Sequence, residues 1–186
     1  MTGNPFTATD FLPYVAYIDQ AGTLRDTFFD SFLFLPHAAF YFSDFGMTHA
    51  GWQYYVNSVF APSFNLSALD RAAGFVGERL GLAADWRVKV FFSLLRPTPV
   101  RPQTEDPEEE TDPTADFYTL EDRKDSIRRL VDIYIERYEA GRYAHTELCG
   151  FCWYEEQLTF ADPLELEVLS FASAYVHARG YKLFWI

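Results

Sequence analysis

Residues 149–156, with the sequence CGFCWYEE, form an apolar, aromatic run that ends in two adjacent carboxylates. Its length and composition are typical of a strand that is buried on both faces, and such strands belong to parallel sheets covered by helices. In parallel sheets and barrels, ligands bind at the carboxyl ends of the strands. The stretch therefore predicts an α/β fold in which Glu155 and Glu156 lie where such proteins keep their active sites.

The rest of the chain supplies further strands and helices in alternation. Strands are predicted at 14–19, 30–36, 88–95 and 181–186, and helices at 52–60, 65–80 and 119–140 and from Pro163 to the stop at Gly180. This order predicts a wound α/β unit with flanking helices. Between the first two strands, either a parallel crossover or a hairpin at Gly22 is compatible with the short connection.

Length and composition limit the classes of function. The chain of 186 residues is large enough for one domain with a real core, and its 19% aromatic content suits a packed core or a cleft for ring-shaped ligands. A net charge of −12 argues against nucleic acid and against anionic membrane surfaces. There is no apolar run of about 18 residues and no signal peptide, so we expect no membrane insertion.

Residues 98–116 are rich in proline and acid. The part from 105 to 116 carries seven acidic residues and no basic one. Such a segment predicts a solvated loop after the strand at 88–95, with a lid or substrate flap as the alternative.

The two cysteines, Cys149 and Cys152, form a C-x-x-C pair. A redox pair needs its first cysteine at a helix N-terminus, and a zinc site needs two more ligands at suitable spacing. Both cysteines instead lie within a predicted strand, and the four histidines do not form a ligand spacing. We therefore expect two buried thiols and no metal. The absence of a glycine-rich phosphate loop predicts no nucleotide cofactor.

Five segments also resemble a bacterial domain-of-unknown-function family, family 4855, which is similar to barrel glycosidases. The segments are YVAYID (14–19), FDSFLFL (29–35), VFFSLLRP (90–97), GFCWYEE (150–156) and ARGYKLFWI (178–186). The resemblance implies a (β/α) TIM-like barrel that acts on or binds polysaccharide, in proteins similar to secreted, cell-surface ones. It also implies that this chain is the N-terminal part of a longer domain, a partial barrel of about five mostly parallel strands. Cys152 stands where the family pattern has an aromatic residue.

Glycoside hydrolysis commonly uses two carboxylates on opposite sides of the scissile bond. Many barrel glycosidases place the acid on a glutamate at the end of the fourth strand, and 149–154 is the fourth predicted strand here. Strand alternation puts Glu156 on the face with the smaller residues and Glu155 on the other. Glu156 is therefore the preferred general acid and Glu155 the second choice. The alternative is that both are solvated residues that open a loop.

Six other residues are candidates for substrate binding: Asp19, His37, Arg96, Trp153, Tyr154 and Trp185. Asp19 is the last residue of one predicted strand, and His37 and Arg96 each follow another, so these polar side chains can position a hydroxyl or a carboxylate. For Asp19 and Arg96 the alternative is a structural salt bridge or cap. The aromatic three can stack on sugar rings, although a tryptophan within a buried strand, such as Trp153, also suits the core.

Three functions follow. The first is a glycoside hydrolase-like barrel domain acting on carbohydrate. The second is a non-catalytic glycan-binding or cell-surface module on the same scaffold, and the third is a complete flavodoxin-like domain with a binding role. In the barrel fragment the strand at 181–186 lies at a sheet edge, which promotes self-association.

Overall fold

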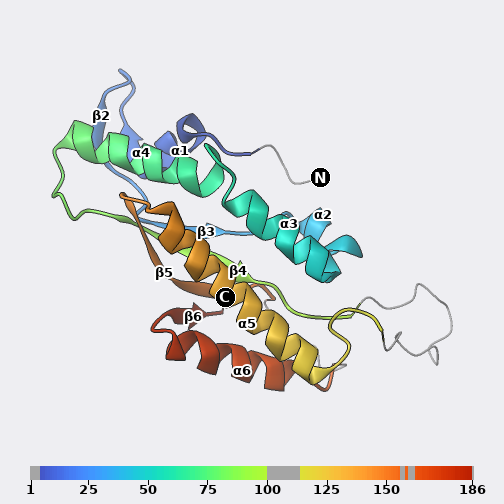
Figure 1. Ribbon diagram of the computed structural model, residues 1–186. Coiled ribbons are helices and arrows are strands. Elements are labelled where there is room, and N and C mark those ends of the chain that lie inside the picture. Colours follow the sequence, from blue (N-terminus) through green and yellow to red (C-terminus); the bar gives the residue numbers. More distant parts are fainter. Residues whose placement is uncertain (1–4, 100–113, 156–157, 159–161, 186) are drawn as a thin grey trace.

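The computed structural model of the protein describes residues 5–99, 114–155, 158 and 162–185 (Figure 1). Its principal feature is a sheet of four strands in the order β3-β4-β5-β6, in which all neighbours are parallel. The strands are β3 Ser31–Phe34, β4 Val88–Leu94, β5 Thr146–Trp153 and β6 Lys182–Phe184. The helices that connect them are α2 Ala38–Tyr41, η1 Phe45–Met47, α3 His49–Val59, α4 Asn65–Leu80, α5 Leu120–Gly141 and α6 Glu165–Ala178.

The strand order in the sheet follows the order along the chain. Parallel crossovers are almost always right-handed, so a sequential order places every connecting helix on the same face of the sheet. Figure 1 agrees, with the helices stacked along one side of the strands. A doubly wound sheet differs, because its strand order reverses at a switch point. The expected α/β class with a parallel sheet is confirmed.

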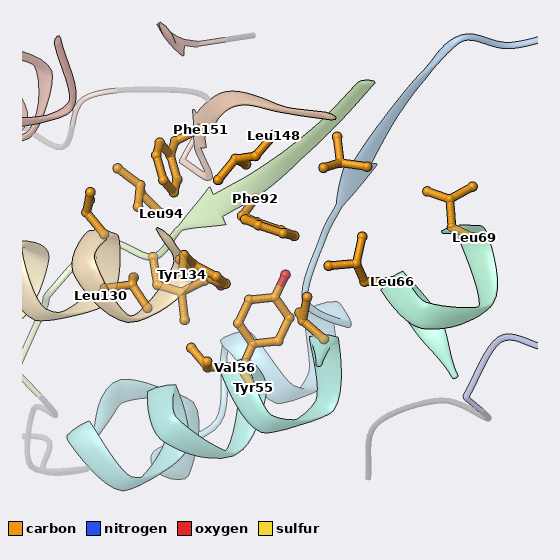
Figure 2. Close-up of a cluster of buried hydrophobic side chains, with 14 of the residues drawn as sticks. Tyr55, Val56, Leu66, Leu69, Phe92, Leu94, Leu130, Tyr134, Leu148 and Phe151 are labelled. Atoms are coloured by element: carbon orange, nitrogen blue, oxygen red, sulfur yellow. The ribbon is translucent and has the colours of Figure 1, made fainter. Parts of the chain in front are cut away.

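The core lies between the sheet and these helices. The ring of Phe92 on β4 stacks on Tyr134 of α5, with centroids 4.7 Å apart and planes 12° apart. The ring centroid of Phe151 on β5 lies 6.0 Å from that of Tyr134. Figure 2 shows the side chain of Tyr55, from α3, pointing toward Phe92 and Tyr134. Each fully buried ring of this size contributes about 2 kcal/mol of hydrophobic stabilisation.

The opposite face of the sheet is less covered. Leu33, Phe91 and Phe184 point to it from three strands and are half-buried. Phe91 and Phe184 meet edge to face, with centroids 5.2 Å apart. This face therefore carries apolar side chains that retain contact with solvent.

Gly150 permits the close contact between β5 and β6. A Cβ atom at this position would lie 2.2 Å from the carbonyl oxygen of Lys182, a distance that no side chain tolerates. The register of β5 against β4 also shifts here, between Val90 and Phe91. Glycine at position 150 is thus a requirement of strand pairing.

The prediction for the N-terminal segment is confirmed only in part: a short strand and a turn at Gly22 form, but outside the main sheet. Residues 14–19 do not form a strand of the parallel sheet: α1 spans Ala8–Val15, and β1 (Ala16–Ile18) pairs antiparallel with β2 (Leu24–Thr27). The Asp10 carboxylate accepts hydrogen bonds from the amide and hydroxyl of Thr7, at 2.8 and 2.6 Å, and this stabilises the first turn of α1. Gly22 takes the positive φ of 77° that the β1–β2 turn needs.

The other predicted elements are confirmed within a few residues. The helices α3, α4, α5 and α6 form at the predicted positions, and Gly81 ends α4 in the left-handed conformation. Four of the five predicted strands make up the sheet. Because the first does not join it, β5 is its third strand and not the fourth. Most of the predicted loop at 98–116 lies outside the described residues, as does Ile186 at the end of the last predicted strand.

Candidate functional site

The carboxyl ends of the sheet strands bring together residues that are far apart in sequence. Arg96 follows β4, Tyr154 and Glu155 follow β5, and Tyr41 lies on α2, which follows β3. Parallel strands end at the same edge of a sheet, and this edge is where α/β proteins bind ligands. We refer to Tyr41, Arg96, Tyr154, Glu155 and Glu165 together as the carboxyl-end cluster.

Glu155 is the central carboxylate of the cluster. Its Oε1 accepts a hydrogen bond of 2.6 Å from the hydroxyl of Tyr41 and lies 3.7 Å from Nε of Arg96. The Glu155 side chain is 17% exposed and that of Arg96 is 16% exposed. The carboxylate is therefore fixed by two partners and still reaches solvent.

Arg96 is held by a second carboxylate. Its Nη1 lies 3.2 Å from Oε1 of Glu165, the first residue of α6, whose side chain is only 2% exposed. Burial opposes the charge of Arg96, but the carboxylates of Glu155 and Glu165 outweigh it and raise the pKa of the guanidinium. Arg96 therefore remains a cation and links the end of β4 to the ends of β5 and α6.

Tyr41 acts as a hydrogen-bond donor in the cluster. Burial, followed by the hydrogen bond and the negative charge of Glu155, raises the pKa of the Tyr41 phenol well above its ordinary value. The hydroxyl thus keeps its proton at neutral pH. The ring of Tyr154 packs against Tyr41, with centroids 4.2 Å apart, and forms an aromatic wall beside the carboxylate.

A buried ion pair anchors the connection between β5 and α6. Nη1 of Arg123 lies 2.6 Å from Oδ2 of Asp162, and both side chains are less than 10% exposed. Nε of Arg123 also donates to the carbonyl of Phe117 at 2.8 Å. The Arg123–Asp162 and Arg96–Glu165 pairs together hold Asp162 and the start of α6, where the chain enters that helix.

The remaining predicted site residues lie in different surroundings. Glu156, the preferred acid, lies outside the described residues. Trp185 follows β6 and is 44% exposed. His37 caps α2, where its Nδ1 accepts from the amide of Ala39 at 3.2 Å. Its ring also lines a cavity of about 660 Å³ beside β3, among mostly apolar side chains.

Asp19 and Trp153 have the structural roles given above as the alternatives to substrate binding, a salt bridge for Asp19 and a core position for Trp153. Asp19 lies in the β1–β2 turn, where it accepts from the amides of Ala21 and Thr23 and pairs with Arg25 at 2.7 Å. Trp153 is 1% exposed and belongs to the core. The structure does not bring either residue to the carboxyl-end cluster.

Two members of the cluster were missed in the sequence. Tyr41 lies in an aromatic segment after β3, and nothing in the local pattern distinguishes it from its phenylalanine neighbours. Glu165 follows Pro163 at the start of α6, where an acidic residue is favoured by the helix dipole alone. The sequence around Tyr41 and Glu165 therefore gives no signal for their contacts with Glu155 and Arg96.

In the part of the chain that the structure describes, the cysteines and the other possible ligand side chains form no metal centre. Cys149 and Cys152 are both free, the first half-buried and the second buried. Within the described ranges, no group of three or more His, Cys, Asp or Glu side chains is arranged to hold a metal ion. Among the helices that the structure describes, none is both long enough and apolar enough to cross a membrane.

Comparison with known proteins identifies a family. The model of a family described as "Domain of unknown function (DUF4855)" matches residues 2–186. No curated protein and no solved structure matches the chain.

Proposed function

The chain belongs to the DUF4855 family, and we propose that it is a glycoside hydrolase-like (β/α)-barrel domain that acts on polysaccharide or on a cell-surface glycan. The observation that supports this proposal best is the position of Glu155. A partly exposed carboxylate at the carboxyl end of a parallel sheet, beside a tyrosine wall and an arginine, is the kind of group that glycoside hydrolysis uses.

The contacts of Glu155 favour a role for it as nucleophile or charge-stabilising carboxylate. The hydroxyl of Tyr41 and the guanidinium of Arg96 fix its orientation, which is what attack on an anomeric carbon requires. In a strand, successive side chains alternate between the two faces, and this pattern predicted that Glu155 points away from the site. The pattern applies only within β5, which ends at Trp153, so it does not fix the direction of Glu155. Glu156 remains the candidate general acid.

The strand order supports the barrel. Barrels of this class keep their strands in chain order with all helices outside, and eight strands close the barrel. The described sheet has four strands in chain order, and its two edges are β3 and β6. The half-exposed apolar face, with Leu33, Phe91 and Phe184, corresponds to the barrel interior. Further strands would cover it, either from additional polypeptide or from a second copy associating at the β3 or β6 edge.

The test is a substitution series assayed by release of reducing sugar from a panel of plant, fungal and bacterial cell-wall polysaccharides. On any polysaccharide that the unmodified protein cleaves, Glu155→Gln should lower turnover at least about 100-fold, the scale expected for a catalytic carboxylate. Binding to the same polysaccharide, followed by affinity electrophoresis, should survive because glutamine keeps the size of the side chain. Glu156→Gln should have an effect of similar size.

Glu147 provides the matched control. It is an exposed glutamate on the same strand, at the opposite end of the sheet. Glu147→Gln should leave turnover unchanged. Equal effects at positions 147 and 155 would contradict the assignment of Glu155.

The exposed Trp185 favours a second function, glycan binding without hydrolysis. Trp185 directly follows β6, at the carboxyl end of that strand, and its exposed indole can serve as a platform for a sugar ring. If the protein binds a polysaccharide but releases no sugar, Trp185→Ala should weaken that binding while Glu155→Gln should not.

A further inference from the structure

A second group of reactive side chains lies between α3 and α5, outside the carboxyl-end cluster. His49 is the first residue of α3, Asp116 lies shortly before α5, and Ser126 lies near the start of α5. Nδ1 of His49 is 3.0 Å from Oδ1 of Asp116, and its Nε2 is 2.8 Å from Oγ of Ser126. A serine, a histidine and an aspartate connected in this order form the arrangement of a hydrolytic triad, which is recognised by geometry and not by sequence position.

The acceptors around His49 decide where its proton lies. A carboxylate only accepts hydrogen bonds, and the nearer one is Asp116, 3.0 Å from Nδ1, while Asp122 lies 3.5 Å from Nε2; the hydrogen of the neutral ring is therefore favoured on Nδ1. In the neutral ring this leaves Nε2 as an acceptor that faces the hydroxyl of Ser126. The second oxygen of Asp116 also accepts from the amide of His49 at 2.9 Å, so the carboxylate fixes the imidazole from two directions.

The hydroxyl of Ser126 can deliver its proton without movement of any heavy atom. In its resting position Oγ lies 2.7 Å from the carbonyl of Asp122, one turn earlier in α5. Rotation about the Cβ–Oγ bond alone redirects the hydrogen to Nε2 of His49. The carboxylate of Asp122, 3.5 Å from the same Nε2, would stabilise the imidazolium that proton transfer creates.

A cavity gives access to the pair. It has a volume of about 170 Å³ and is lined by both His49 and Ser126, together with Trp52, Gln53 and Arg129. Arg129 is exposed, and its guanidinium can supply positive charge to a developing oxyanion. The small volume suits a short acyl group better than a long acyl chain.

We propose that Ser126, His49 and Asp116 form an esterase site that removes short acyl groups. Oγ of Ser126 attacks the ester carbonyl carbon as its proton passes to Nε2 of His49. The ester C–O bond then breaks, and the alcohol leaves with that proton. Water attacks the acyl-serine in the same way, giving its proton to His49, and the Oγ–C bond breaks to release the carboxylic acid and restore the serine. This site uses none of the residues of the proposed glycosidase, and its test is independent of that function.

The first experiment is labelling of the full chain with a fluorophosphonate probe, followed by mass spectrometry of the modified peptide. The expected label is on Ser126. In a parallel assay the protein should hydrolyse 4-nitrophenyl acetate, and it should hydrolyse 4-nitrophenyl octanoate at least about 10-fold more slowly because the cavity is small. Both readouts use the unmodified protein, so they do not depend on the folding of a variant.

Substitutions then separate catalysis from packing. Ser126→Ala should remove the label and lower acetate ester hydrolysis at least about 100-fold, and Asp116→Asn should lower hydrolysis similarly. Ser170→Ala is the matched control. Ser170 also lies in a helix, and its hydroxyl bonds to the carbonyl one turn earlier at 2.7 Å. This substitution should leave both readouts unchanged. An unlabelled Ser126 in the unmodified protein, or hydrolysis that survives Ser126→Ala, would overturn the proposal.

Discussion

Glu165 is almost completely buried, and its carboxylate lies against the guanidinium of Arg96. Glu165→Gln removes the charge but keeps the shape, which leaves Arg96 with less compensation in a site that is largely shielded from water. We expect a loss of about 3 kcal/mol in the free energy of unfolding, as for other buried pairs that lose one partner. Urea unfolding checks this as a lower midpoint with an unchanged slope.

Glu121 is the control for this substitution. It is 73% exposed and lies 3.6 Å from Lys124 on the surface of α5. Exposed pairs contribute little, so Glu121→Gln should change the stability by less than about 0.5 kcal/mol. Equal losses at positions 165 and 121 would show that burial of the Arg96 pair is not what makes it important.

Cys152 allows a test of burial at the level of a single thiol. Burial raises its pKa to about 11, so only about one molecule in a thousand carries the thiolate at pH 8. Iodoacetamide at that pH should leave Cys152 unmodified in the folded protein and modify it in urea. Mass spectrometry after a timed reaction gives the result. Fast modification of the folded protein would mean that the strand opens readily.

At the scale of elements, the pairing of β5 with β6 depends on Gly150. In Gly150→Ala the new methyl group would overlap main-chain atoms of Lys182, so the strands must separate. We expect a loss of about 2–3 kcal/mol, the usual cost of forcing atoms into a packed site. Hydrogen exchange at the amides of residues 182–184 should accelerate at the same time.

Gly77 offers the opposite substitution. It lies inside α4, and a Cβ there would meet Trp86 at 3.5 Å, an ordinary contact. Gly77→Ala should therefore raise the free energy of unfolding by up to about 1 kcal/mol, because alanine favours the helix. A loss of stability in Gly77→Ala would contradict the open contact with Trp86 described for this position.

The same elements show what the sequence could predict. The long helices were found because their ends are marked, by Thr119 before α5 and by Gly81 after α4. The strands of the sheet were found because buried parallel strands are apolar runs. The helix α1 was missed because its last residues, from 14 onward, also have the apolar character of a strand. The spacing of Phe11 and Val15, which lie on one face of the helix, was the signal that could have revealed it.

The candidate site was predictable only in part, for a related reason. Arg96 and Glu155 follow strands, and parallel strands bring their ends together, so this contact follows from the fold class. Tyr41 and Glu155 are 114 residues apart, and their hydrogen bond depends on how α2 turns back over the sheet. No local pattern encodes that turn. The same holds for His49 and Ser126, which lie 77 residues apart.

At the scale of the whole molecule, buried tyrosines should limit stability in alkali. Burial is the first cause that raises the pKa of Tyr41, Tyr55 and Tyr134 above the ordinary value. A raised pKa in the folded state gives stability that is complete below about pH 10, where unfolded tyrosines begin to ionise, and that is lost as the pH rises further. The free energy of unfolding should therefore fall steeply above about pH 10.

Tyrosinate absorbance and circular dichroism followed together provide the measurement. The phenols of Tyr41, Tyr55 and Tyr134 should ionise only as the protein unfolds and its helical circular dichroism is lost. Complete ionisation of the tyrosines in a folded protein would contradict the burial of these three phenols.

The sequential strand order also has a consequence for the way the chain folds as it is made. From β4 onward, each strand of the main sheet pairs with the strand that precedes it along the chain, so the sheet can grow by one strand at a time from β3. Contacts between successive units close shorter loops than contacts between distant ones, and short loops form faster. Once β5 has left the ribosome, three strands can already be paired, and β6 would join them later by docking beside Gly150.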